Sequence, residues 1–187
     1  TKNLDFSLSV FVRMLYSCLV DADFLDTEAF MKNENTGRVA GETMQILEGK
    51  LEQYIEPWLS NTELESINGR RTEILAHCME MGKREKGIYR LTVPTGGGKT
   101  IASLAFALRH QMDRIIYVIP YTSIIEQNAQ VFREILGAEN VLENHCNVEY
   151  KDSEEFYPMQ LASENWDKPV VVTTNVQFFE SLFGNKS

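Results

Sequence analysis

The sequence is poor in the residues that build disulfide or zinc scaffolds. Its 187 residues include three cysteines and three histidines, and no two cysteines form a CxxC pair. The odd count and wide spacing of Cys18, Cys78 and Cys146 indicate neither a disulfide framework nor a zinc site. Because the sequence also shows no secretory signal pattern, we expect reduced thiols and a cytoplasmic location.

Long apolar runs and an excess of positive charge are missing as well. No uncharged apolar stretch is long enough to span a bilayer, so we expect no membrane partner. Eighteen basic residues stand against 27 acidic ones, a net charge of −9. Domains that bind nucleic acid unaided usually present a basic surface, so the composition does not support such a role here. With 43% hydrophobic residues, the chain is typical of globular proteins rather than of disordered or collagen-like ones.

The pattern of apolar residues changes near residue 85. Before it, apolar residues recur at three- and four-residue steps, which predicts helices over 4–24, 43–59 and 62–81, with a polar loop over 26–41. After it, short β-branched runs alternate with helical patterns, which indicates crossover units and a parallel sheet. The expected fold class is α/β, with an all-helical segment first. Strands are predicted over 88–93, 114–119, 139–142 and 170–173, and helices over 99–112, 122–136 and 175–183.

The main functional signal is the run PTGGGKT from Pro94 to Thr100, between a predicted strand and a predicted helix. Glycines allow the loop backbone to turn its N–H groups toward phosphate oxygens, and the helix adds its positive end. Lys99 would contact the β- and γ-phosphates, and the Thr100 hydroxyl would bind Mg²⁺. The alternative is a glycine-rich turn beside a lysine, which the flanking strand and helix disfavour. The expected nucleotide-binding residues are Thr95, Gly96, Gly97, Gly98, Lys99 and Thr100.

Two further polar blocks follow predicted strands at their carboxyl ends, where parallel sheets bind ligands. They are PYTSIIEQ, residues 120–127, and TTNVQ, residues 173–177. The simpler interpretation is helix capping, by Thr122 or Ser123 in the first block and by Thr174 or Asn175 in the second. The alternative is contact with a nucleic-acid backbone through these helix starts and through Gln127.

Other residues of the metal-binding type have simpler interpretations. The acidic group Asp21, Asp23, Asp26 and Glu28 does not fit a calcium loop, because Leu25 and Asp26 occupy the places of an oxygen ligand and a glycine. Carboxylates at a helix end are the favoured interpretation. His145 is expected to be structural or solvated, and the acidic run over 149–155 to be a solvated loop.

Three blocks of the sequence together resemble a known family. LTVPTGGGKT, IYVIPYTSIIEQNA and VVVTTNVQFFESLF are similar, in the same order, to the CRISPR-associated HD-nuclease/helicase of type I systems. In this sequence Val93 stands where the general phosphate-loop pattern has its first glycine, and Pro-Thr-Gly follows. This is the form of the loop that superfamily-two helicases use. The resemblance implies a protein that hydrolyses Mg²⁺-ATP to move 3′-to-5′ on single-stranded DNA. It also implies recruitment by the CRISPR surveillance complex, and degradation of foreign DNA by an HD nuclease that needs a divalent transition metal.

The resemblance assigns roles residue by residue. Gly96, Gly98, Lys99 and Thr100 match the ATP loop. The implied DNA-contact residues are Pro120, Thr122, Gln127, Thr173, Thr174 and Gln177, although the family often has an arginine where Thr122 stands. The segment SCLVDADFLDTE resembles the end of the HD domain, where Asp23, or else Asp21, matches the last metal ligand. The implied domains are 1–30, the end of the HD domain; 31–85, a helical connector; and 86–187, part of the first RecA-like domain.

Several parts of that family pattern are not found in this sequence. The HD histidines, a DExx acid after Val172 and the second RecA-like domain do not occur. We therefore expect a fragment that binds ATP but neither cleaves DNA nor hydrolyses ATP appreciably, and that self-associates through apolar faces. The alternatives are a P-loop ATPase or kinase of another class and a non-enzymatic module that binds a partner.

Overall fold

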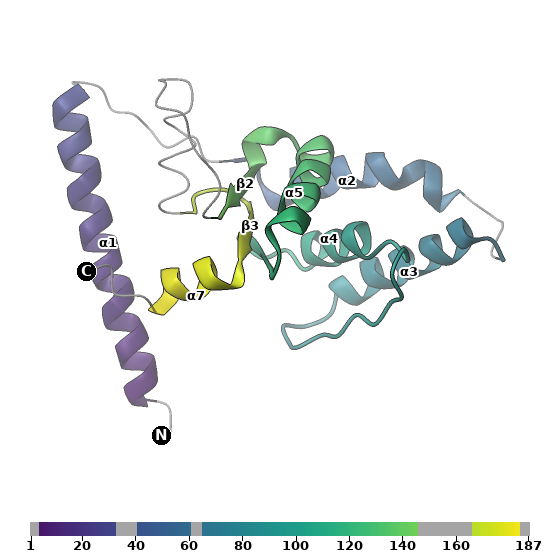
Figure 1. Cartoon of the computed structure of the whole chain (residues 1–187), viewed down its shortest axis with the longest axis horizontal. Coiled ribbons are helices and arrows are strands. Elements are labelled where there is room, and N and C mark those ends of the chain that lie inside the picture. Colours follow the sequence, from purple (N-terminus) through teal and green to yellow (C-terminus); the bar gives the residue numbers. More distant parts are fainter. Residues whose placement is uncertain (1–3, 33–40, 61–64, 146–165, 184–187) are drawn as a thin grey trace. The chain divides into compact units, whose positions relative to one another are not determined.

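The computed structural model describes residues 4–32, 41–60, 65–145 and 166–183 (Figure 1). It separates into two units, Thr1–Val39 and Ala40–Ser187. Among the described residues, no helix is long and apolar enough to cross a membrane. The capping box expected at Thr62, residues 33–40 of the loop expected over 26–41, and nearly all of the acidic loop after Asn144 lie outside the described residues. Residues 26–32 of that expected loop are helical.

The first unit is described as one helix, α1, which covers Leu4–Lys32. The helix was predicted to end near residue 24, but it continues for two more turns. The extension has a local cause, because the segment TEAFMK contains no glycine or proline and several good helix formers. Leu8, Phe11 and Leu15, on the predicted apolar face, are 57%, 56% and 55% exposed.

The second unit confirms the expected α/β class, with helices first and a parallel sheet after them. Its helices are α2 (Met44–Leu59), α3 (Ile67–Gly82), α4 (Lys99–Arg109), α5 (Thr122–Leu136), the 3₁₀ turn η1 (Ala138–Asn140) and α7 (Asn175–Phe183). Its strands are β1 (Ile115–Ile119), β2 (Val141–Asn144) and β3 (Val170–Thr174). The strand expected over 139–142 begins two residues later, because η1 takes up the first part of that segment.

The sheet has the order β1-β3-β2, and both pairings are parallel. The central position of β3 explains its composition, since Val170, Val171 and Val172 are all fully buried, as expected for a strand with neighbours on both sides. The helix α5 carries the chain from one edge strand to the other. Parallel register places Ile119 opposite Thr174, so β1 and β3 end at the same edge of the sheet.

One face of the sheet packs against the helices α2, α4 and α5. Their inward residues recur at helical spacing, for example Leu104 and Leu108 of α4, and join Val170 and Val172 in one buried cluster. The Tyr117 hydroxyl donates a hydrogen bond to Ser103 Oγ at 3.2 Å, which links β1 to α4. Burial raises the pKa of this phenol well above its usual range.

The opposite face of the sheet is less well covered among the described residues. Ile116 and Val118 of β1 point to it and are 39% and 37% exposed. The four exposed apolar side chains of α7 are Val176, Phe179, Leu182 and Phe183. The described part of the chain therefore leaves several apolar side chains of β1 and α7 exposed.

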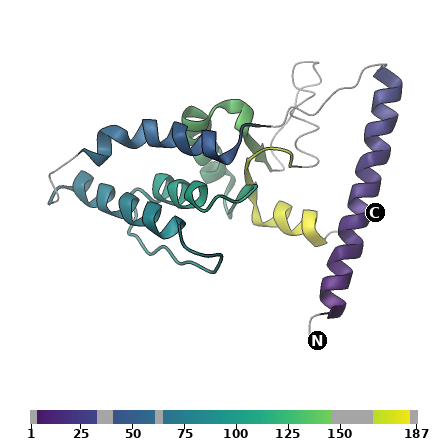
Figure 2. The same cartoon turned by 180° about the vertical axis from the view of Figure 1, so that it is seen from behind.

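The strand expected over 88–93 is wrong. These residues form no strand, Ile88 is fully exposed, and Figure 2 draws the chain between α3 and α4 as a loop without an arrow. A β-branched run becomes a strand only when a neighbouring backbone pairs with it, and none of the described strands does. Instead, the Tyr89 ring contacts those of Phe106 and His110 on α4, with centroid distances of 5.1 and 5.9 Å.

Two of the expected helix caps also differ. Ser66, rather than Thr62, caps α3 by accepting a hydrogen bond from Gly69 N at 3.0 Å. The N-cap position of α5 is Tyr121, with no side-chain hydrogen bond, so neither Thr122 nor Ser123 caps this helix. Thr174 behaves as expected, because its hydroxyl accepts from Gln177 N at 3.0 Å at the start of α7.

Gly49 offers a stabilising substitution in α2. It is exposed in the middle of the helix, and a Cβ built there meets nothing within 4 Å. We expect Gly49→Ala to raise the free energy of unfolding by about 0.5–1 kcal/mol, because alanine loses less backbone entropy in a helix. Urea unfolding followed by circular dichroism measures this change. In the matched variant Gly82→Ala the new Cβ would lie 2.6 Å from Arg109 Cβ, so that variant is expected to lose stability; equal gains in both variants would contradict this account.

Candidate nucleotide-binding site

The segment that precedes α4 forms a tight turn. Gly97 N donates a hydrogen bond to Pro94 O at 3.1 Å, and Gly96, at the third position of this turn, has φ = +81°. A positive φ at that position is the requirement of a type II turn and favours glycine. Gly98 also has a positive φ, +80°, where it stands as the N-cap of α4. The glycines of PTGGGKT are therefore needed for the backbone path between loop and helix.

The loop leads directly into a helix N-terminus. Lys99 is the first residue of α4, and the first backbone bond of the helix runs from Ala102 N to Gly98 O at 3.1 Å. The N–H groups that precede Ala102 in the helix have no intrahelical acceptor, as at every helix start. Together with the exposed Lys99 side chain, they offer donors and positive charge to an anion.

Thr100 lies beside these donors and is held by α5. Its hydroxyl donates to Asn128 Oδ1 at 3.0 Å, and Asn128 Nδ2 in turn donates to Ile124 O at 2.9 Å. A hydroxyl that donates its proton to an amide oxygen keeps its own lone pairs available for a cation such as Mg²⁺. Asn128 was not among the predicted site residues, although its place directly after Gln127 in the block IIEQN was a usable signal.

A cleft of about 960 Å³ opens above the loop. One wall consists of the loop, the first turn of α4 and Gln127; the other consists of the end of α2 and the first half of α3. The residues of the second wall are Pro57, Trp58, Ser60, Asn68, Arg71, Thr72 and Leu75. Five of the six expected nucleotide-binding residues line the cleft, the exception being Gly97. Its volume lies within the usual range of ligand sites.

The residues expected to contact DNA differ in location and in burial. Gln127 lines the cleft with Lys99, whereas Pro120 is exposed directly after β1 and Thr122 is half-buried in the first turn of α5. Thr173 is fully buried, and its Oγ1 has no hydrogen-bond partner within the described part of the chain. The hydroxyl of Thr174 and the backbone N–H of Gln177 bond to each other at the start of α7.

The expected HD-site residue Asp23 lies on α1, in the first unit, and is exposed; Asp21, the second choice, is half-buried. The group of possible metal ligands that the described residues bring together is a different one: Glu126, Glu143 and His145, whose ligand atoms all lie within 4.8 Å of one another. Asp23 therefore takes no part in a described cluster of metal-binding side chains.

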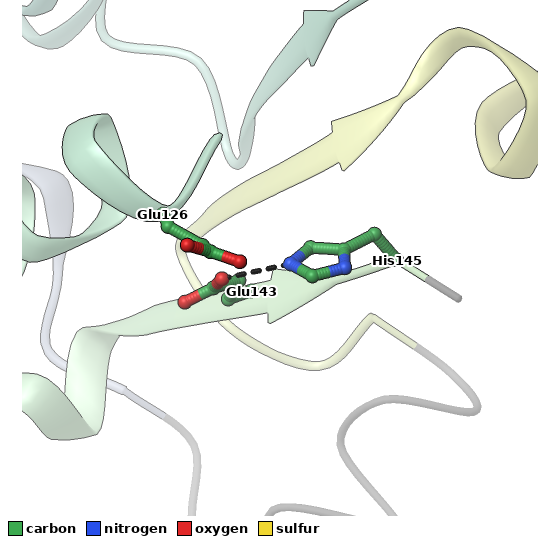
Figure 3. Close-up of side chains that lie close together, drawn as sticks. All are labelled: Glu126, Glu143 and His145. Carbon is green, nitrogen blue, oxygen red and sulfur yellow. Dashed lines mark hydrogen bonds and ion pairs between the residues drawn. The ribbon is translucent and has the colours of Figure 1, made fainter. Parts of the chain in front are cut away.

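Two members of the group around Glu143 are joined by contacts that need no cation. Figure 3 shows the His145 ring directed at the Glu143 carboxylate, where Nε2 lies 2.8 Å from Oε1, with Glu126 alongside. The other oxygen of Glu143 forms an ion pair with Arg133 Nη1 at 2.8 Å. Two of the three possible ligands, Glu143 and His145, therefore bond to each other, and Glu143 also pairs with a guanidinium. His145 is buried and bonds to Glu143, whose ion pair with Arg133 links β2 to α5; this agrees with the structural role expected for His145.

The fold and the loop define a class of protein: an α/β chain in which a glycine-rich loop leads into a helix N-terminus beside a large cleft. The family described as "Type III restriction enzyme, res subunit" matches residues 48–186. The chain belongs to this family, and the match runs from within α2 through α7.

The chain is also similar to a curated protein, the CRISPR-associated nuclease/helicase Cas3 of Haloferax volcanii. The two are 36% identical over 124 residues, in an alignment that covers 52% of this chain and 13% of that protein. This similarity confirms the resemblance indicated by the three sequence blocks. The chain spans only a small part of the length of this relative.

Proposed function

We propose that this chain provides the ATP-binding half-site of a CRISPR-type DNA helicase. The observation that carries the proposal is the cleft, which brings Lys99 and Thr100 together with a helix N-terminus and leaves about 960 Å³ for a ligand. Lys99 and the first N–H groups of α4 bind the phosphates. Thr100, whose hydroxyl donates a hydrogen bond to Asn128, binds Mg²⁺ through its oxygen. Family membership and the similarity to a nuclease/helicase support this assignment.

The proposal extends to single-stranded DNA as a partner at the carboxyl edge of the sheet. Pro120 follows β1, and Thr174 is the last residue of β3, which ends at the same edge. Thr122 and Gln177 lie in the first turns of the helices that come next. Backbone N–H groups at such helix starts suit phosphate contacts. Thr173 is buried, so in this proposal it acts by shaping the end of β3. Gln127, which lines the nucleotide cleft, connects that cleft to the DNA-binding edge of the sheet.

The remaining roles rest on resemblance. Asp23 is proposed as a ligand of the HD nuclease metal, and the CRISPR surveillance complex as the partner that recruits the protein in the cytoplasm. The division into 1–30, 31–85 and 86–187 stays a prediction, as does self-association, for which the exposed apolar residues of α1 are the supporting observation. Hydrolysis of ATP and cleavage of DNA are proposed for the whole protein and are not expected from this chain alone.

A tryptophan in the cleft provides the test. The chain has two tryptophans; Trp58 is 40% exposed and lines the cleft, whereas Trp166 stacks on Phe178 with a centroid distance of 6.1 Å. In Trp166→Phe, which leaves Trp58 as the single emitter, we expect Mg²⁺-ATP to change the fluorescence in a saturable manner, because the ligand displaces water from the indole.

The matched control is Trp58→Phe, which keeps Trp166 and is expected to show little change with the same titration. Calorimetry on the unmodified chain gives an independent measure of binding. A folded chain that shows neither an emission change nor binding heat with Mg²⁺-ATP would rule out the proposed site and favour a non-enzymatic role.

A further inference from the structure

Arg71 connects the two walls of the nucleotide cleft. It lies on α3, and its Nε donates a hydrogen bond at 2.9 Å to the carbonyl oxygen of Gly96, 25 residues later in the chain. The same guanidinium is oriented by Asn68, whose Oδ1 accepts from Arg71 Nη1 at 3.3 Å. Its aliphatic part also approaches the start of α4, since Arg71 Cγ is 3.6 Å from the place of a Cβ on Gly98.

These bonds hold one peptide group of the loop at both ends. The peptide between Gly96 and Gly97 donates its N–H to Pro94 O and accepts from Arg71 through its carbonyl oxygen. Glycine sequences have many backbone conformations of similar energy, so an unrestrained GGG segment would exchange among several of them. A rotation of this peptide would also redirect the next N–H groups, those that face the cleft.

We propose that Arg71 is a positioning residue for the phosphate loop: it holds the loop in its phosphate-binding conformation while the cleft is empty. The proposal rests on the proposed function of the cleft as a nucleotide site. Arg71 acts through the Gly96 carbonyl, and Asn68 fixes the orientation of the guanidinium. In this way α3 becomes part of the nucleotide site, although a long irregular segment separates it from the loop in the chain.

A positioning role and a direct phosphate contact predict different nucleotide dependence. A residue that orders the loop should affect ATP and ADP by the same factor, because both use the same N–H groups. A residue that binds the γ-phosphate should affect ATP much more than ADP. The ratio of the two changes in affinity therefore distinguishes the roles.

The test compares Arg71→Ala with Arg70→Ala, an exposed arginine at the preceding position of the same helix. In the nucleotide-free chain, NMR-detected amide exchange at Gly97 is expected to become roughly 3- to 10-fold faster in Arg71→Ala, the range for losing one hydrogen bond, and to stay unchanged in Arg70→Ala. Asn68→Ala is expected to give a smaller change in the same direction. Unchanged exchange in Arg71→Ala would overturn the proposal.

Affinities measured by calorimetry complete the test. We expect the Kd values of Mg²⁺-ATP and Mg²⁺-ADP to rise by the same factor in Arg71→Ala, roughly 3- to 10-fold. A loss confined to ATP would replace the positioning role by a γ-phosphate contact. If the unmodified chain binds neither nucleotide, the proposed function fails, and the exchange comparison alone then decides whether Arg71 holds the loop.

Discussion

Replacing Lys99 by alanine is expected to lower the affinity for Mg²⁺-ATP by roughly 100-fold or more while leaving the fold intact. Hydrogen bonds to charged groups contribute about 1.5–3 kcal/mol each, and the ammonium of Lys99 is proposed to make two, to the β- and γ-phosphates. The side chain is exposed at the start of α4, so its loss leaves no cavity and no buried group without a partner. Calorimetric titration of both proteins with Mg²⁺-ATP measures the effect.

The matched control for this variant is Lys83→Ala. Lys83 is also an exposed lysine, and it forms an ion pair with Glu80 at 2.8 Å on the surface of α3, a type of contact that contributes little to stability. It is expected to bind nucleotide as the unmodified chain does. Undiminished ATP affinity in a folded Lys99→Ala protein would remove the nucleotide assignment altogether.

The largest expected effect on stability comes from Phe132→Ala. Phe132 is fully buried on α5, and its ring centroid lies 4.7 Å from that of Tyr117 on β1. Removing such a ring costs about 3–5 kcal/mol, a large part of the 5–15 kcal/mol or so that typically separates folded from unfolded domains. We expect urea unfolding to shift to much lower denaturant, or the chain to be partly unfolded in buffer.

Phe179→Ala serves as the comparison, because the same ring is removed from a side chain that is 56% exposed on α7. Its exposure limits the expected loss to about 1 kcal/mol, which comes from its contacts with the rings of Phe178 and Phe183. A loss of about 1 kcal/mol in both variants would mean that α5 does not form the centre of the core. A loss of several kcal/mol in both would mean that the exposed face of α7 is covered in solution.

The helices and the phosphate loop could be predicted because their signals are local. The spacing of Leu47, Leu51 and Ile55 indicates the buried side of α2, and all three are indeed buried. The three glycines and Lys99 predict a turn that leads into a helix, since positive φ values and helix starts depend on a few consecutive residues. The β-branched runs of β1 and β3 were found for the same reason.

Features that depend on a distant partner could not be predicted. The run from Ile88 to Val93 has the composition of a strand, but no described strand pairs with it. Gln127 was expected at a DNA surface, and the fold places it in the cleft beside Lys99 and Thr100. Arg71 lies in no motif, and Asn128 is marked only by its place after Gln127. The fold alone brings them to the loop and to the start of α4, at 2.9 Å from Gly96 and 3.0 Å from Thr100.

The sequence by itself determined the α/β class, the helix faces of the second unit and the glycine turn that leads into a helix with its lysine and threonine. Only the tertiary structure decided which strands pair, which wall closes the cleft and which side chains hold the loop. The physical reason is that backbone preferences and apolar periodicity act over a few neighbouring residues. Strand pairing and hydrogen bonds between side chains and loops, in contrast, join groups that are far apart in the chain and meet only after the core has packed.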